Sequence, residues 1–126
     1  MKKLIAMAVT GALALVVPAG LASAGDDDVI ERGSCRDTSD WKLKLSPEDG
    51  GIEAEFEVDQ NVTGDRWRVR VRHDGQLAFT GVRRTQGASG SFELRIVEPN
   101  HAGTDAFRAR ARNLSTGEVC NGSASL

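Results

Sequence analysis

Residues 65–74 read Asp65-Arg-Trp-Arg-Val-Arg-Val-Arg-His-Asp74, with an arginine at every second position. The residues between the arginines are Trp67, Val69 and Val71, so charged and apolar side chains alternate strictly. Successive side chains of a β-strand point to opposite faces, and this alternation therefore predicts a strand with one buried and one wet face. Whether the wet arginine stripe binds a ligand is the main question about function.

The same period of two recurs along the chain. It is present in four further segments, residues 41–45, 52–58, 92–96 and 107–111. Turn-rich breaks separate these segments, and no stretch after residue 24 has helical spacing. We therefore expect an all-β fold, with seven to eight antiparallel strands in a single β-sandwich. An eight-stranded β-barrel is the alternative architecture.

The first 24 residues predict a secretory signal peptide in helical form. Two lysines precede an apolar run from Leu4 to Val17, and Ala22-Ser23-Ala24 is a typical cleavage site. The run is too short to span a bilayer, so we expect a secreted, extracellular protein without a membrane anchor. Loss of two lysines and no acid would shift the formal net charge from −2 to −4. The expected organisation is a signal peptide at 1–24, a flexible acidic lead-in at 25–31 and one domain at 32–126.

The part of the chain after residue 24 contains two cysteines, Cys35 and Cys120. In an oxidising compartment an even pair predicts a disulfide. Neither cysteine has a histidine or another cysteine close in sequence, which argues against a catalytic thiol or a metal ligand.

The order of these features resembles immunoglobulin-like and fibronectin type III-like domains over residues 32–126. The inward Trp67 on the third main strand and the chain length carry this resemblance, which implies an immunoglobulin-like β-sandwich. The chain departs from the pattern because its cysteines tie the first and last strands, and because it lacks a tyrosine for a tyrosine corner. The segment WKLKLSPEDGGIEAEFEVD, residues 41–59, is also similar to small secreted proteins of actinomycetes, a likeness that implies no activity.

The hairpin at His73-Asp74-Gly75 admits two registers. A two-residue Asp-Gly turn would place Leu77 and Phe79 on the wet face, whereas a three-residue loop that pairs Arg72 with Gln76 keeps both inside. We therefore expect the second register, with an unoccupied space above Gly81 for the indole. The expected pairs are Val71 with Leu77, Val69 with Phe79, and Trp67 with Gly81.

The environment of the arginine stripe depends on the topology. If strand 52–58 pairs directly with strand 66–72, three glutamates neutralise three arginines: Glu57 with Arg68, Glu55 with Arg70, and Glu53 with Arg72. In an immunoglobulin-like sandwich these strands lie in opposite sheets, and the glutamates face lysines instead: Lys44 with Glu53, and Lys42 with Glu55. The arginines then gather on one outer face, which is either merely solvated or a candidate binding face. Its members are Arg66, Arg68, Arg70, Arg72, Arg108, Arg110 and Arg112.

The sequence predicts no enzyme, cofactor or metal site. His73 and His101 are expected to be exposed loop residues, with Asp74 directed away from its neighbour His73. The chain has no Gly-x-Ser-x-Gly elbow, no phosphate loop and no clustered histidine or cysteine ligands.

Two non-enzymatic functions are compatible with these features. The first is a secreted binding or adhesion module that uses the arginine face or the loops at one end of the sandwich. The candidate loops are 60–64, 83–90 and 98–105, with Arg83 and Arg84 as candidate contacts. The alternative is a small inhibitor of an extracellular hydrolase that acts through an exposed loop. The partners considered are an anionic cell-surface polymer and a secreted protein, whereas the negative net charge argues against nucleic acid.

Overall fold

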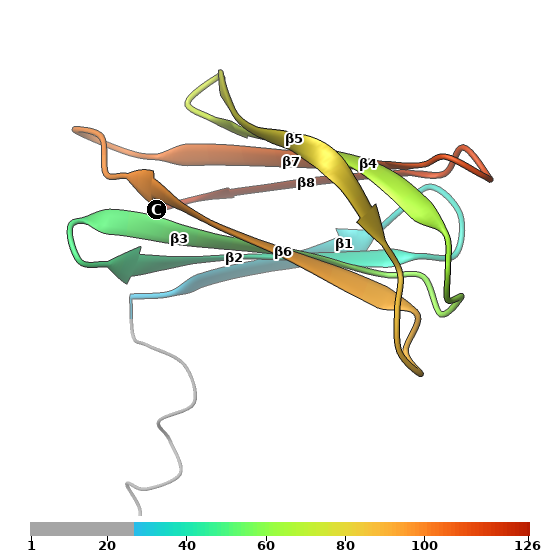
Figure 1. Cartoon of the computed structure of the whole chain (residues 1–126). Coiled ribbons are helices and arrows are strands. Elements are labelled where there is room, and N and C mark those ends of the chain that lie inside the picture. The colour runs from blue at the N-terminus through green and yellow to red at the C-terminus, as the bar shows by residue number, and fades with distance from the viewer. Residues whose placement is uncertain (1–26) are drawn as a thin grey trace, which may run out of the picture.

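The computed structural model describes residues 27–126, which form eight β-strands and no helix (Figure 1). Within these residues there is accordingly no helical segment that could serve as a membrane span. The signal peptide expected at 1–24 lies outside the described residues. The strands are β1 (Val29–Ser34), β2 (Asp40–Glu48), β3 (Gly51–Asp59), β4 (Arg66–His73), β5 (Gln76–Arg84), β6 (Ser91–Pro99), β7 (Ala106–Asn113) and β8 (Val119–Ser125).

The strands form two antiparallel sheets that lie face to face (Figure 1). The first sheet has the order β1-β2-β3-β6, and the second has the order β5-β4-β7-β8. The predicted all-β sandwich is confirmed, and the barrel alternative is wrong because the two sheets remain separate, each with its own edge strands. From β2 onward the third strand, β4, pairs with the sixth, β7, as in immunoglobulin-like sandwiches, whereas the fourth strand, β5, lies at the edge next to β4.

The first strand begins earlier than the expected domain start at residue 32. Residues Val29–Glu31 belong to β1, where Val29 pairs with Leu45 and packs against the core. The Asp28 carboxylate lies 3.6 Å from Lys44 Nζ. The C-terminal part of the expected acidic lead-in 25–31 is therefore held by the sheet, because pairing with β2 satisfies its backbone.

Alternate residues of the strands fill the space between the sheets. Trp67 is completely buried, and its ring lies 6.1 Å from that of Phe92 on the opposite sheet. The indole Nε1 donates a hydrogen bond of 3.0 Å to Gln60 Oε1, which satisfies the one polar atom of this large side chain. The apolar half of each alternating pattern thus forms the core, as the sequence predicts.

The β4–β5 hairpin differs from the expected register. His73 pairs with Gln76 across a two-residue Asp74-Gly75 turn, in which both residues have positive φ angles of 49° and 86°. A bulge then shifts the ladder, so that Arg72 faces Leu77 while Val71 faces Phe79. The bulge allows both the two-residue turn that hairpins favour and the packing of Phe79 against the core, and it leaves Leu77 50% exposed.

The remaining predicted pairs of this hairpin are displaced by the same bulge. Val69 faces Gly81 and Trp67 faces Arg83. The space above Gly81 is filled by the Phe79 ring, whose nearest atom would lie 2.8 Å from a Cβ at this position. The indole of Trp67 therefore does not occupy it.

The β2–β3 hairpin also turns on an Asp-Gly pair, Asp49-Gly50, with φ angles of 43° and 82°. This turn places Lys42 opposite Glu57 and Lys44 opposite Glu55. The predicted lysine–glutamate face is therefore present, but its register is shifted by two residues from the expected one, because the strands extend right up to the tight turn.

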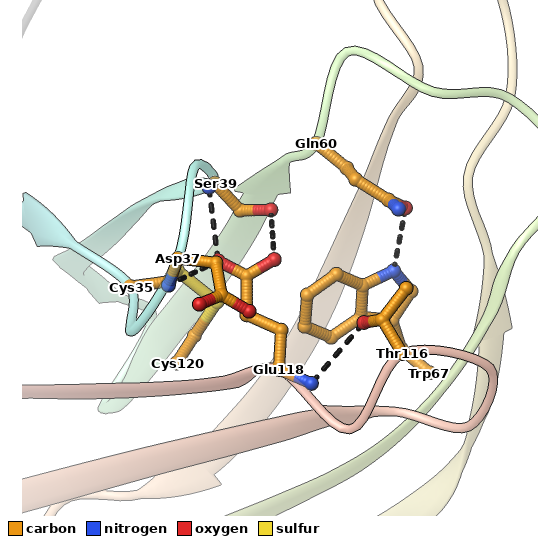
Figure 2. Close-up of a disulfide and its surroundings, with 8 residues drawn as sticks. All are labelled: Cys35, Asp37, Ser39, Gln60, Trp67, Thr116, Glu118 and Cys120. Carbon is orange, nitrogen blue, oxygen red and sulfur yellow. Dashed lines mark hydrogen bonds between the residues drawn. A yellow bond between two sulfur atoms is a disulfide. The ribbon is translucent and has the colours of Figure 1, made fainter.

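The predicted disulfide between Cys35 and Cys120 is confirmed (Figure 2). Cys35 follows β1 and Cys120 lies in β8, so the bond connects the two sheets. Beside it, the buried Glu118 carboxylate accepts hydrogen bonds from the backbone N–H groups of Asp37 and Ser39, at 2.9 and 3.0 Å. Burial raises the pKa of Glu118, but these bonds and that of the Ser39 hydroxyl lower it overall. The loop after β1 is thus fixed by the disulfide and by hydrogen bonds to the Glu118 carboxylate.

Candidate functional site

Arginines of neighbouring strands stand directly opposite one another on the outer face of the second sheet. Three such pairs, or rungs, cross the ladder between β4 and β7: Arg68 with Arg112, Arg70 with Arg110, and Arg72 with Arg108. A fourth pair, Arg66 with Arg84, lies across β4 and β5. We call these eight exposed side chains the arginine face: Arg66, Arg68, Arg70, Arg72, Arg84, Arg108, Arg110 and Arg112.

No acidic residue balances this face from within its own sheet. Strands β4, β5, β7 and β8 contain neither aspartate nor glutamate. Among residues 29–126, no carboxylate forms an ion pair with any member of the arginine face. Neutralisation of the stripe by Glu53, Glu55 and Glu57 is therefore excluded, since β3 pairs with β2 and β6 in the other sheet.

The outer face of the first sheet has the opposite character. Glu57 lies 3.7 Å from Lys42, and Arg95 lies 3.4 Å from Glu53 and 3.7 Å from Glu55. Charges of both signs alternate there and compensate one another. One side of the sandwich is thus electrostatically mixed, while the other carries positive charge only.

An open hollow of about 340 Å³ lies on the arginine face. It forms because the short side chains of Asn121 and Ser123 on β8 stand beside the long side chains of Arg110 and Arg108 on β7. Arg70 and Arg72 complete its lining. Its volume is near the lower end of that of ligand clefts, and its walls offer guanidinium, amide and hydroxyl groups.

Arg83 and Arg84, predicted in a loop, are the last residues of β5 and point to opposite faces. Arg83 lies over the Phe79 ring at 5.0 Å, whereas Arg84 joins the arginine face and donates a 2.7 Å hydrogen bond to the Gly64 carbonyl. The loops 60–64 and 85–90 pack together through two bonds to the Gly90 carbonyl. Loop 98–105 lies at the other end of the sandwich, so the candidate loops do not form one cluster.

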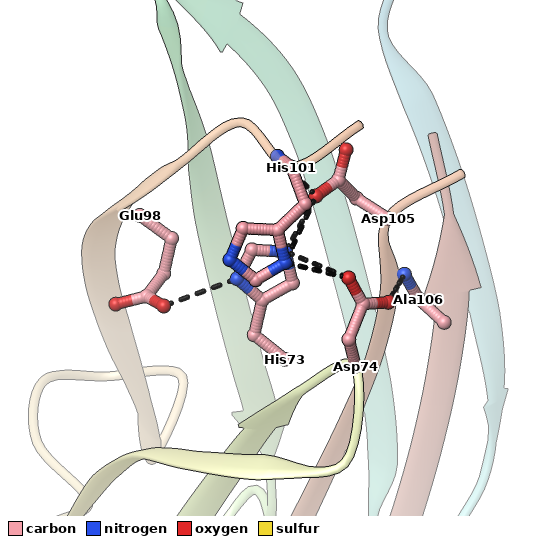
Figure 3. A network of polar contacts seen from close by, with 6 residues as sticks. All are labelled: His73, Asp74, Glu98, His101, Asp105 and Ala106. Carbon is pink, nitrogen blue, oxygen red and sulfur yellow. Dashed lines mark hydrogen bonds and ion pairs between the residues drawn. The ribbon is translucent and has the colours of Figure 1, made fainter. Parts of the chain in front are cut away.

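A second polar cluster, centred on the His73 ring, lies at that other end (Figure 3). His73 is only 1% exposed. Its Nε2 lies 2.6 Å from Asp105 Oδ1, and its Nδ1 lies 3.1 Å from Glu98 Oε1. Phe107 stacks on one side of the ring at 4.3 Å, and His101 stacks on the other at 3.9 Å. His101 in turn contacts Asp74, at 2.7 Å. The prediction that His73 is an exposed loop residue is wrong, because it is the last inward position of β4.

The geometry of this cluster bears on the protonation of His73 and Asp105. Both nitrogens of His73 face carboxylates, so this geometry favours the imidazolium form, which donates from both nitrogens. Burial lowers the pKa of His73, but the bonds to Asp105 and Glu98 and the nearby negative charges outweigh this and raise it. Burial raises the pKa of Asp105, yet the His101 backbone N–H and the His73 side chain lower it overall.

The same cluster has the residue types of a metal site. One ligand atom each from His73, Asp74, His101 and Asp105 lies within 4.8 Å of the others. The two imidazole planes, however, are parallel to within 6° and stacked. Imidazole nitrogens bind metals in the plane of the ring, so stacked rings cannot both direct a lone pair at one ion. The arrangement instead fits a network of hydrogen bonds between the histidines and the carboxylates. This network stabilises the loop 100–105.

Sequence reasoning missed this cluster, since its members come from the end of β4, the β4–β5 turn, the end of β6 and the β6–β7 loop. The one local signal was the inward parity of His73, which continues Trp67, Val69 and Val71. It also missed Arg84 as a member of the arginine face, because that membership depends on the bulge and the register of β5.

Comparisons with protein-family models, curated proteins and solved structures find no match for the chain. The function must therefore be inferred from the surface itself.

Proposed function

We propose that this protein is a secreted, non-enzymatic binding module that holds an anionic polymer on its arginine face. The observation that carries the proposal is the set of three arginine pairs across β4 and β7. Like charges directly opposite each other destabilise a sheet. A negatively charged ligand attracts both arginines of each pair and so offsets their repulsion. The face is therefore more stable with such a ligand bound than without it.

The distribution of charge also supports binding over simple solvation. A solubilising surface works with charges of both signs, as on the outer face of the first sheet. The arginine face concentrates a single sign in a chain whose formal net charge is −2. Arginine is suited to this role because its planar guanidinium forms two parallel hydrogen bonds with phosphate or carboxylate.

Secretion is supported by two separate features. The N-terminal sequence has the charged, apolar and small-residue parts of a signal peptide. The disulfide between Cys35 and Cys120 is compatible with an oxidising, extracellular compartment. An anionic cell-surface polymer is a partner that a secreted protein meets there.

The proposal is tested by retention of the purified protein on immobilised heparin and on a teichoic polymer across a salt series. We expect retention at 50 mM salt and steep loss by 200 mM, because counterions compete for the phosphate or sulfate groups. The variant R66Q/R68Q/R70Q/R72Q removes four positive charges from the arginine face and should elute with the unbound fraction.

The matched control is R32Q/K42Q/K44Q/R95Q, which removes four positive charges from the first sheet. Circular dichroism verifies that both variants are folded. Equal retention of the two variants would contradict the proposal, since only net charge would then matter. A salt-resistant, stoichiometric complex with an extracellular hydrolase would instead favour the inhibitor function.

A further inference from the structure

The rungs of the arginine face repeat at a regular interval. Residues on one face of a strand are two positions apart, which corresponds to about 6.8 Å along an antiparallel strand. The rungs Arg68/Arg112, Arg70/Arg110 and Arg72/Arg108 follow each other at this interval. Arg66 extends the β4 row by one further step. The positive charges therefore form an evenly spaced row along the strand direction.

The interval corresponds to a definite chemical repeat. Two residues contribute six backbone bonds, and an extended chain advances about 1.2 Å per bond. A phosphodiester polymer with a three-carbon linker also has six bonds between successive phosphorus atoms, in the order P–O–C–C–C–O–P. Its extended repeat is thus about 7 Å by the same measure. The spacing of the phosphates in such a polymer therefore matches the spacing of the rungs.

We infer that the arginine face binds a linear phosphodiester polymer with three-carbon polyol linkers, laid parallel to β4 and β7 with one phosphate per rung. This inference rests on the proposed function and specifies its ligand. Each phosphate accepts hydrogen bonds from the two guanidiniums of its rung. The flexible linkers follow the twist of the sheet.

The hollow beside β7 supports a polyol as the linker. Asn121 stands opposite Arg110, and Ser123 stands opposite Arg108. Their amide and hydroxyl groups can exchange hydrogen bonds with hydroxyls of the linker while the arginines hold the flanking phosphates. The small size of both side chains leaves room for this contact.

The absence of aromatic side chains on this face argues against single-stranded nucleic acid, whose backbone has the same six-bond repeat. Proteins that bind single strands without sequence preference stack the bases on exposed aromatic rings. Within residues 27–126, the Trp and Phe side chains of the second sheet are Trp67, Phe79 and Phe107, and all three occupy inward positions of their strands. The face offers positive charge and hydroxyl contacts but no stacking platform.

The test compares labelled oligomers of four phosphates by fluorescence anisotropy at 50 mM salt, using the purified protein. The probes are glycerol phosphate with six bonds per repeat, ribitol phosphate with eight, linear polyphosphate with two, and single-stranded DNA. We expect glycerol phosphate to bind at least about fivefold more tightly than ribitol phosphate or polyphosphate, because among these three only its repeat matches the spacing of the rungs. In a length series, the affinity should rise up to four phosphates and then level off.

The variant R70Q/R110Q, which removes the middle rung, should abolish this preference, whereas R32Q/R95Q on the first sheet should retain it. Affinities that simply follow charge density, with polyphosphate the tightest probe, would overturn the inference and leave the proposed function standing. Tighter binding of DNA than of glycerol phosphate would overturn it in favour of a nucleic-acid partner. If no probe binds, the proposed function itself fails.

Discussion

His73 connects the end of β4 to residues that lie 25 to 34 positions further along the chain. It lies between His101 and Phe107, and its nitrogens contact Asp105 and Glu98. Asp105 also accepts a hydrogen bond from the backbone N–H of His101, at 3.0 Å. Because both nitrogens and both faces of the ring are occupied, His73 is placed to hold the β6–β7 loop against β4 rather than to contact a ligand.

The stability of the protein should depend on pH through this residue. The pKa of His73 is raised above its ordinary 6.5, so its contribution to the free energy of unfolding is fully present below pH 6.5 and is lost as pH rises through the raised value. The pKa values of Asp74 and Asp105 are lowered from 3.8, so their contributions are present above pH 3.8 and are lost as pH falls through the lowered values. The cluster should therefore contribute most to the free energy of unfolding between pH 3.8 and pH 6.5. Urea unfolding from pH 3 to pH 9 measures this profile.

The variant H73Q isolates the histidine contribution. Glutamine retains hydrogen-bonding capacity but cannot carry the positive charge, so the decline of stability on the alkaline side should disappear. The exposed R32Q serves as the control and should keep the wild-type profile. Parallel curves for H73Q and the wild type would show that His73 is not charged in the folded state.

At the scale of elements, β4 and β7 form a ladder whose outer side chains repel. Arg110 stands between Arg70 on β4 and Asn121 on β8, with no acidic residue in any of the four strands of the sheet. The ladder is held by its backbone hydrogen bonds and by the buried residues on its inner face, Val69, Val71, Ala109 and Ala111.

Substitution R110E should therefore stabilise the protein while it weakens polymer binding. The new glutamate would face Arg70 directly, and such a cross-strand pair is worth about 0.2–1 kcal/mol at low salt. Urea unfolding at 20 and 500 mM salt measures the gain, which should shrink at high salt because of screening. The neutral variant R110Q should show a smaller gain. Destabilisation by R110E would mean that the arginines do not repel in the free protein.

At the scale of the whole molecule, the two sheets are connected at one edge by covalent and packing contacts. The disulfide joins the end of β1 to β8 across 85 residues. Next to it, the indole of Trp41 is wedged between Gly33 of β1 and Gly122 of β8, where an added Cβ would lie 2.7 Å from the ring in either case. These contacts hold the second sheet, which carries the arginine face, against the first sheet.

Removal of the disulfide in C35A/C120A should lower the free energy of unfolding by about 4–5 kcal/mol, because a closed loop of this length restricts the unfolded chain. Urea unfolding followed by tryptophan fluorescence measures the loss. A reducing agent should destabilise the wild type by a similar amount and leave the variant unchanged. Insensitivity of the wild type to reduction would mean that the bond contributes little.

For strands with strict alternation, such as β3, β4 and β7, the sequence by itself determined where the strand lies and which of its sides is buried. This information is local, since alternation with a period of two can be read within five to nine residues. Pairing of the two cysteines could likewise be deduced, because only one partner is available to each. The inward and outward roles of Trp67 and the arginines of β4 follow from the same parity.

Only the tertiary structure decided which residues face each other across the strands and which side chains meet between distant segments. The placement of Arg70 beside Arg110, the addition of Arg84 to the arginine face and the registers of both Asp-Gly hairpins depend on strand pairing and on a bulge. The contact of His73 with Asp105 spans 32 residues and joins a strand to a loop. Such contacts are set by the competition of turn geometry and burial over the whole domain, and no local pattern contains them.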